Sequence, residues 1–140
     1  MEWIKDTLAL RTNGKGMIKI NSQLDALIHK LGIQDGMCFL FLQHVSCSLA
    51  ISEGFDPPAR ADVETFFERL VPEGETWHEH TIEGPDDSPA HIKATLTQPS
   101  LTIPIDNGRL NLGIWQGVYL FEHRSHPQKR IIMLRCLKVN

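Results

Sequence analysis

Segments with strand character lie at both ends of the chain, and segments with helix character lie between them. The strand-like segments are residues 3–10, 15–20, 37–42, 100–105, 115–124 and 130–137. Turn residues such as Asp106-Asn107-Gly108 and Ser125-His126-Pro127 separate the later ones. This order predicts an α+β fold with a largely antiparallel or mixed sheet and about three helices.

The first two strand-like segments, residues 3–10 and 15–20, flank Thr12-Asn13-Gly14, which predicts a hairpin at the start of the fold. The run of residues 37–42 is continuously apolar, short and rich in Phe. Such a run favours a strand that is covered on both sides.

Three helix starts are visible between the strands. Asn21 or Ser22 precedes apolar residues at helical spacing, and Gly32 follows them as a stop signal. Asp56 before Pro57 and Ser88 before Pro89 each combine a capping oxygen with a proline suited to the first helical turn. The segment of residues 73–89 between the last two helices has loop composition, and long loops within compact domains are often functional.

The 140 residues predict one domain, residues 1–140, because domains commonly contain about 100–200 residues. Hydrophobic residues make up 41% and charged residues 22%, which argues against disorder and fibrous folds. The net charge of −3 gives no general footprint for nucleic acid. No apolar run approaches the length of a membrane span, and the first residues lack the pattern of a signal peptide. We therefore expect no nucleic-acid or membrane partner and a cytoplasmic location.

Three cysteines, Cys38, Cys47 and Cys136, form no CxxC pair. An odd and sparse set of this kind suggests neither a disulfide framework nor a thiolate zinc site, so we expect thiols in or near the core. Histidine is the more informative residue, with seven copies, because imidazole titrates near neutrality and binds metals.

The first polar constellation is His44-Val45-Ser46-Cys47-Ser48. If this segment is extended, its period of two places His44, Ser46 and Ser48 on one face. Two interpretations remain open. The strand simply reaches the surface here, or an imidazole and two hydroxyls at its end hold a phosphate or a metal-bound ligand.

The second constellation spans residues 78–93. His78 and His80 are one residue apart, and His91 falls in the first turn of the third predicted helix. The positive end of the helix dipole disfavours imidazolium, so we expect His91 to be neutral and available as a ligand. Asp86 and Asp87 either cap that helix or hold a divalent cation.

The third constellation is the strand of residues 115–124, in which Gln116 and Glu122 share a face. Six residues of straight strand span about 20 Å, so one small ligand within one subunit cannot contact both side chains. Either one of them serves a site, or an assembly brings the second from another subunit. Dinucleotide, P-loop and hydrolase-elbow motifs are absent, which argues against those enzyme classes.

Several blocks in the same order resemble the YjbQ family, whose members are known as secondary thiamine-phosphate synthases. The blocks are HVSCSLAISEGFDPPARADVE, EGPDDSPAHIK, SLTIPIDNGRLNLGIWQG and EHR, and they cover most of the chain. Val45 stands where the family usually has Thr, and Ser88 where Met is frequent. The resemblance implies a compact α+β homotrimer with sites near the subunit contacts.

The resemblance also implies the site residues. It assigns catalysis to His44, Asp87, His91 and Glu122, ligand binding to Ser46, Ser48 and Gln116, and metal binding to His44, His80 and His91. The implied cofactor is a divalent metal ion, Mg²⁺ or Zn²⁺. We expect the three metal-binding histidines to converge on one site.

The implied reaction joins an aminopyrimidine diphosphate to a thiazole phosphate and releases pyrophosphate, so a small phosphorylated metabolite is the expected partner. A divalent metal, a helix N-terminus and histidine donors suit the charge of the leaving pyrophosphate. The alternative is a trimer that binds a metal or phosphometabolite without catalysis. Metal content, followed by turnover with and without the metal, discriminates these alternatives.

Overall fold

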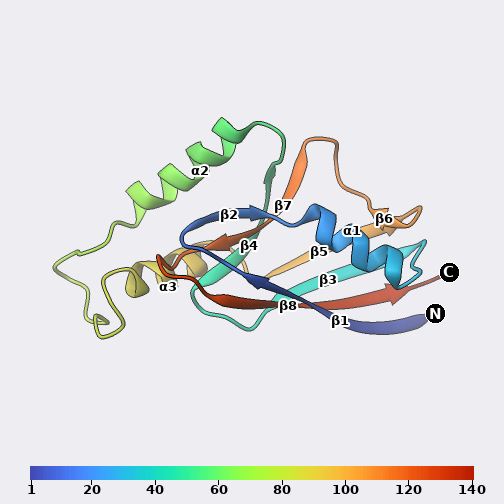
Figure 1. Ribbon diagram of the computed structural model, residues 1–140, viewed down its shortest axis with the longest axis horizontal. Helices are drawn as coiled ribbons and strands as arrows, with labels where there is room; N and C mark the ends of the chain where they lie inside the picture. Colours follow the sequence, from blue (N-terminus) through green and yellow to red (C-terminus); the bar gives the residue numbers. More distant parts are fainter.

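The computed structural model describes residues 1–140 as two antiparallel sheets with three helices (Figure 1). The five-stranded sheet has the order β1 (Glu2–Arg11), β8 (Lys129–Lys138), β3 (Gly36–Leu42), β5 (Ser100–Asp106) and β6 (Arg109–Leu110). The three-stranded sheet has the order β2 (Gly16–Lys19), β7 (Gln116–Glu122) and β4 (Cys47–Glu53). The predicted α+β class and the antiparallel character of the sheets are confirmed.

The core lies between the two sheets. Its buried side chains alternate along several strands, as Cys38, Leu40 and Leu42 do on β3 and Leu101 and Ile103 on β5. Alternation with a period of two is the pattern of strands that bury one face. All three cysteines are free and buried, as expected.

The three helices cover different parts of the sheets. Helix α1 (Asn21–Lys30) buries Leu24 and Ile28 in the main core and ends before Gly32, whose φ of 66° suits a helix stop. Helix α2 (Pro57–Leu70) packs Val63 and Phe67 against the other face of the three-stranded sheet. Helix α3 (Asp87–Leu96) contacts β4.

The predicted opening hairpin is wrong. β1 pairs along its whole length with β8, from Glu2 opposite Lys138 to Arg11 opposite Lys129. β2 instead pairs with β7 in the other sheet. The turn at Asn13-Gly14 therefore carries the chain from one sheet to the other.

Two further local expectations need correction. Residues 37–42 are covered on one side only, since Phe39 and Phe41 lie exposed on the outer face of the five-stranded sheet. The polar residues at the helix starts make no side-chain capping bonds, and α3 begins at Asp87, before Ser88. Asn21 and Asp86 use their side-chain oxygens for contacts with other elements instead.

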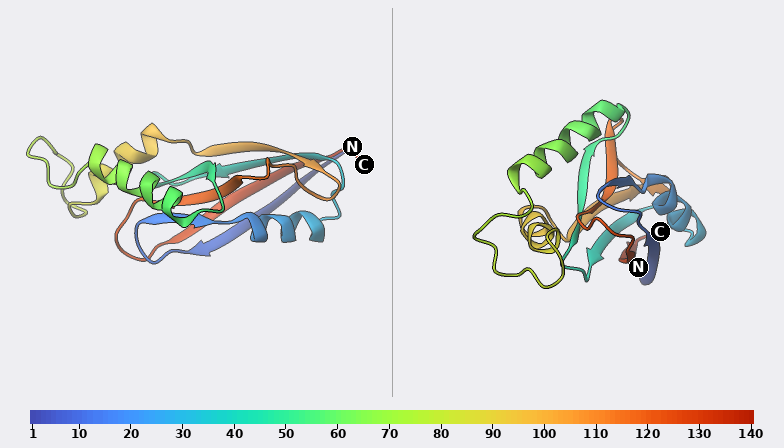
Figure 2. Two further views of the ribbon diagram at one scale, coloured as in Figure 1. Left: turned by 90° about the horizontal axis from the view of Figure 1, so that it is seen from above. Right: turned by 60° about the vertical axis from the view of Figure 1, so that its left-hand side comes forward.

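The molecule is elongated, and its two ends differ (Figure 2). Helix α3 and the loop that precedes it lie at one end, while the two chain termini lie side by side at the other. None of the helices has the length and apolar character needed to cross a bilayer.

Candidate functional site

Three side chains from the loop and helix α3 converge on one point. Nε2 of His80 and Nε2 of His91 lie 2.7 and 3.0 Å from the same oxygen of Asp87, Oδ2. One ligand atom from each residue lies within 4.8 Å of the others. The Asp87 side chain is 5% exposed, whereas those of His80 and His91 are 50% and 35% exposed. The group therefore has a buried base and an open side.

Local structure explains this arrangement. Asp87 and His91 are four residues apart on α3 and therefore share one face of the helix. His80 arrives from the loop before the helix, and its ring lies 5.2 Å from the ring of His91, measured between centroids. His78, which sequence spacing paired with His80, instead packs its ring against Trp77 at 4.4 Å.

A backbone carbonyl fixes the proton of His91. Nδ1 of His91 lies 2.8 Å from the carbonyl oxygen of Val45, in the segment between β3 and β4. A carbonyl oxygen only accepts hydrogen bonds, so Nδ1 must carry a proton and donate it. In the neutral ring, Nε2 then presents a lone pair toward Asp87.

The Asp87 carboxylate is held in its ionised form. Burial alone would raise its pKa, but the hydrogen bond from His80 and the positive charge of Arg124 help to lower the pKa below the ordinary value. Nη1 of Arg124 lies 2.9 Å from Asp87 Oδ1, the oxygen that the histidines do not use. Each carboxylate oxygen therefore has its own partners.

His44 lies near this group but outside it. It lines a cavity of about 490 Å³ with His91, Val45, Ala94 and Thr95. Nε2 of His44 accepts a hydrogen bond from the backbone N–H of Ile131 at 3.0 Å. Burial and the charge of Arg130 lower the pKa of His44, which favours the neutral ring. The three residues whose ligand atoms lie together are thus His80, Asp87 and His91, and metal binding by His44 stays a prediction.

Glu122 and Ser46 lie in a buried network centred on Arg130. Nη2 of Arg130 lies 2.5 Å from Glu122 Oε2 and 2.9 Å from Ser46 Oγ. The hydroxyl of Thr12 also donates to Glu122, at 2.7 Å. Glu122 is fully buried, and these bonds occupy its carboxylate inside the fold. This network joins β7, β8 and the segment before β4, and Glu122 is not part of the group around Asp87.

Ser48 and Gln116 lie elsewhere. Oγ of Ser48 and Nε2 of His123 are 2.9 Å apart in the interior. Oε1 of Gln116 accepts a hydrogen bond from the N–H of Gly113 at 2.7 Å, at the opposite end of β7 from Glu122. The expected stripe of His44, Ser46 and Ser48 does not form, because the chain bends at residues 45–46 before β4 begins.

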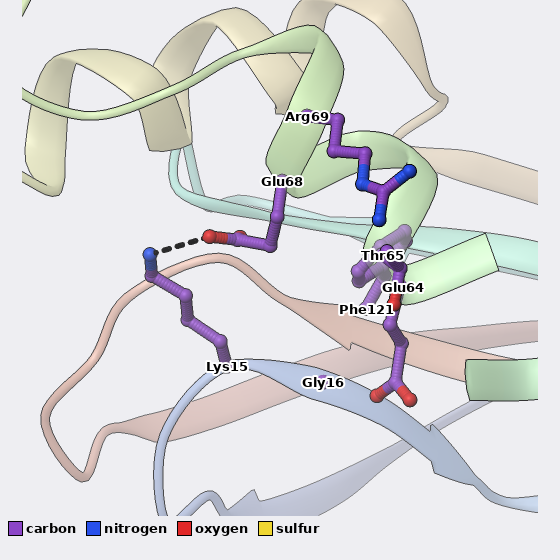
Figure 3. A pocket seen from close by; sticks show the side chains of 7 residues that line it. All are labelled: Lys15, Gly16, Glu64, Thr65, Glu68, Arg69 and Phe121. Atoms are coloured by element: carbon purple, nitrogen blue, oxygen red, sulfur yellow. Dashed lines mark hydrogen bonds and ion pairs between the residues drawn. The ribbon is translucent and has the colours of Figure 1, made fainter. Parts of the chain in front are cut away.

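A second cavity, of about 600 Å³, lies between α2 and β2 (Figure 3). Three of its four charged side chains, Lys15, Glu64 and Glu68, are paired, whereas Arg69 makes no hydrogen bond or ion pair. Lys15 lies 3.1 Å from Glu68, and Glu64 accepts a hydrogen bond from the N–H of Met17. Glu68 also pairs with the buried Lys93. These pairs fasten α2 to its neighbours and leave Arg69 as the one charged lining side chain without a partner.

Sequence reasoning missed two contributors to the group around Asp87. Arg124 ends the predicted strand of residues 115–124 and lies in the EHR block, but neither feature places it beside Asp87. The carbonyl of Val45 has no side-chain signal at all, because every residue carries a carbonyl.

The family model described as UPF0047 protein YjbQ-like matches residues 6–138. The chain belongs to this family. The YjbQ family relative sll1880 of Synechocystis sp. is 44% identical over 130 residues, which is 93% of this chain and 88% of that protein. The UPF0047 protein YjbQ of Escherichia coli O157:H7 is 39% identical over 94% of this chain and 95% of its own length.

Solved structures of similar proteins share the fold. A conserved hypothetical protein of Thermus thermophilus superimposes with a TM-score of 0.85 at 32% identity, over 94% of this chain and 99% of that one. A protein from Sulfolobus solfataricus also has a TM-score of 0.85, at 20% identity, over 99% and 100% of the two chains, and is described as of unknown function.

These comparisons correct the expected activity. The relatives are named only as UPF0047 proteins, and none of these names mentions thiamine phosphate or a transferase. The expectation of a thiamine-phosphate synthase is therefore wrong as an inference from the family. Function must be argued from the His80, Asp87 and His91 group itself.

Proposed function

We propose that the protein binds one divalent transition-metal ion, such as Zn²⁺, through His80, Asp87 and His91. The observation that carries the proposal is the orientation of His91. Its Nδ1 proton is committed to the Val45 carbonyl, so its Nε2 lone pair faces a carboxylate oxygen 3.0 Å away. Two acceptors at this distance repel each other unless a cation, either a proton on Nε2 or a metal ion, lies between them.

The donor set favours a metal of the zinc type. Two imidazole nitrogens and one carboxylate oxygen are ligands that Zn²⁺ commonly uses, whereas Mg²⁺ prefers an octahedron of oxygens. Tetrahedral zinc ligands lie about 3.3 Å apart, given Zn–N and Zn–O distances of about 2.0–2.2 Å. The separations of 2.7 and 3.0 Å from Asp87 Oδ2 require shifts of only a few tenths of an ångström. Of the two expected cofactors, Zn²⁺ is thus the better fit.

The outer arrangement also resembles that of functional metal sites. A ligating histidine usually donates its second nitrogen to a carbonyl or carboxylate, as His91 does to Val45. Three protein ligands leave a coordination position open on the exposed side of His80. A bound metal there would supply Lewis acidity for an oxygen ligand. The small phosphorylated metabolite stays a prediction for that open position.

Zinc titration of the chelator-treated protein tests the proposal. We expect isothermal titration calorimetry to give one Zn²⁺ per chain. His91→Ala should weaken binding by at least the roughly 10–100-fold that loss of an outer-sphere partner costs. The exposed His29 on α1 supplies the matched control, and His29→Ala should bind as the wild type does.

Thermal melting separates the metal role of His91 from a structural role. Alanine favours helices and the His91 ring is partly exposed, so we expect His91→Ala to lower the Tm by less than about 5 °C without metal. Wild-type protein that takes up no Zn²⁺ would refute the proposal. So would a variant that melts much earlier yet binds Zn²⁺ unchanged.

A further inference from the structure

Arg124 connects three segments beneath the histidine group. Its Nε lies 2.9 Å from Asp86 Oδ2, its Nη1 lies 2.9 Å from Asp87 Oδ1, and its Nη2 donates to the Glu83 carbonyl at 3.1 Å. The guanidinium side chain is 18% exposed. Asp86 also accepts a hydrogen bond from the N–H of Ser125, at 2.9 Å. Arg124 is therefore held in one orientation from two sides.

This orientation divides the Asp87 carboxylate between two roles. Oδ1 forms an ion pair with the Arg124 guanidinium, whereas Oδ2 faces both histidines. We propose that Arg124 is a positioning residue that limits Asp87 to one ligating oxygen and so sets the coordination number and selectivity of the site. The inference rests on the proposed metal-binding function.

The number of ligating oxygens decides which cation fits. Ca²⁺ takes six to eight oxygen ligands, often with carboxylates that bind through both oxygens, whereas Zn²⁺ is commonly four-coordinate. A carboxylate whose second oxygen is committed to a guanidinium offers one oxygen, which suits the smaller coordination number. The fixed fork of donors in arginine holds both neighbouring aspartates at once, which a lysine ammonium cannot reproduce.

Loss of Arg124 should therefore change the kind of site rather than abolish it. In Arg124→Gln, Oδ1 of Asp87 is released from its ion pair and becomes able to ligate beside Oδ2. We expect the ratio of Zn²⁺ to Ca²⁺ affinity to fall by about tenfold or more, the size of many outer-sphere effects. The visible absorption of bound Co²⁺ should weaken, because its intensity falls as the coordination number rises.

The experiment compares Co²⁺ spectra and competitive Zn²⁺ and Ca²⁺ titrations of wild type, Arg124→Gln and Asp86→Asn. Asp86→Asn is the matched control, because it weakens the other anchor of Arg124 and leaves the contact with Asp87 in place. We expect it to lower stability but to keep the wild-type Co²⁺ spectrum. If Arg124 only stabilised the fold, both variants would lose stability and both would keep the wild-type Co²⁺ spectrum.

The outcomes separate the two proposals. A wild-type protein that binds neither Co²⁺ nor Zn²⁺ refutes the metal site itself. If the wild type binds these ions and a folded Arg124→Gln variant keeps the same Co²⁺ spectrum and selectivity, the positioning role of Arg124 is overturned. The metal site itself then stands. If Arg124→Gln does not fold, Arg124→Lys decides, since it keeps the charge but not the fork. An intermediate spectrum for that variant supports the role, and an unchanged one refutes it.

Discussion

His123 shows how burial shapes a single histidine in this fold. Its ring is 1% exposed, its Nε2 contacts Ser48, and its Nδ1 has no hydrogen-bond partner. Burial, followed by the positive charges of Lys93 and Arg130, lowers the pKa of His123 to about 3. The folded protein therefore keeps this ring neutral far below the pH at which an exposed histidine takes up a proton.

We predict that His123 makes the protein sensitive to acid. The unfolded chain binds a proton at His123 near pH 6.5, whereas the folded chain does so only near pH 3. The stability that His123 contributes is therefore complete above pH 6.5 and is lost as the pH falls toward 3. Between pH 7.5 and 4.5 this loss amounts to at most about 2–3 kcal/mol, from about 1.4 kcal/mol per pH unit.

Urea unfolding of wild type and His123→Phe at several pH values measures this effect. The variant removes the titrating group and keeps a ring beside Phe121, although it leaves the Ser48 hydroxyl without its partner. The wild type alone should lose this stability, so its unfolding free energy minus that of the variant should fall as the pH falls. A difference that is constant from pH 7.5 to 4.5 would contradict the prediction.

The candidate site was only partly predictable from single residues. The spacing of Asp87 and His91 places both on one helix face, so their proximity follows from the sequence once the helix is recognised. His80 belongs to an irregular loop, whose path no periodicity describes. The period-two argument for Ser46 and Ser48 assumed an extended chain, and the bend at residues 45–46 invalidates it.

At the scale of elements, local signals predicted helices and strands better than they predicted which strands pair. All three helices start within a residue or two of a recognised start signal. β4 and the two-residue β6 were missed as strands, since residues 44–48 were considered extended only as a condition. The pairing of β1 with β8 depends on side chains at opposite ends of the chain, and no local turn specifies it. Local turn chemistry at Asn13-Gly14 therefore predicted a hairpin that does not exist.

Asn21 illustrates a contact between elements that can be tested. Its Oδ1 accepts a hydrogen bond from the N–H of Val118 at 2.7 Å, which continues the ladder on β7 where β2 ends at Lys19. We predict that Asn21→Ala lowers the free energy of unfolding by about 1–2 kcal/mol, because Val118 is buried and its N–H loses its acceptor.

Urea unfolding measures this loss, with Ser22→Ala as the control. Ser22 is the next residue of α1 and is exposed, so its replacement should cost little. Equal stabilities of the two variants would show that the Asn21 contact adds nothing.

At the scale of the whole molecule, the outer face of the five-stranded sheet leaves large apolar side chains in solvent. Trp3, Phe39, Phe41 and Ile131 are 54%, 36%, 46% and 41% exposed. Apolar surface of this kind often marks a protein contact. The homotrimer stays a prediction, and this face is where we expect copies of the chain to meet.

Light scattering tests the trimer. We predict a mass about three times the 15.9 kDa of the chain at micromolar concentration. Phe41→Asp should reduce that mass, because a charge on this face opposes its burial. Phe66→Asp on α2, where the side chain is 57% exposed, should not. A monomeric wild type would contradict the prediction.

The full-length ladder between β1 and β8 has a practical consequence. It brings Glu2 beside Lys138, so both ends of the described chain emerge together at the end of the molecule remote from α3 (Figure 2). A fluorophore, an affinity tag or a sensor surface attached at either terminus is therefore displaced from His80, Asp87 and His91 by the length of the fold. Immobilised protein presents its histidine group to the solution and its termini to the support.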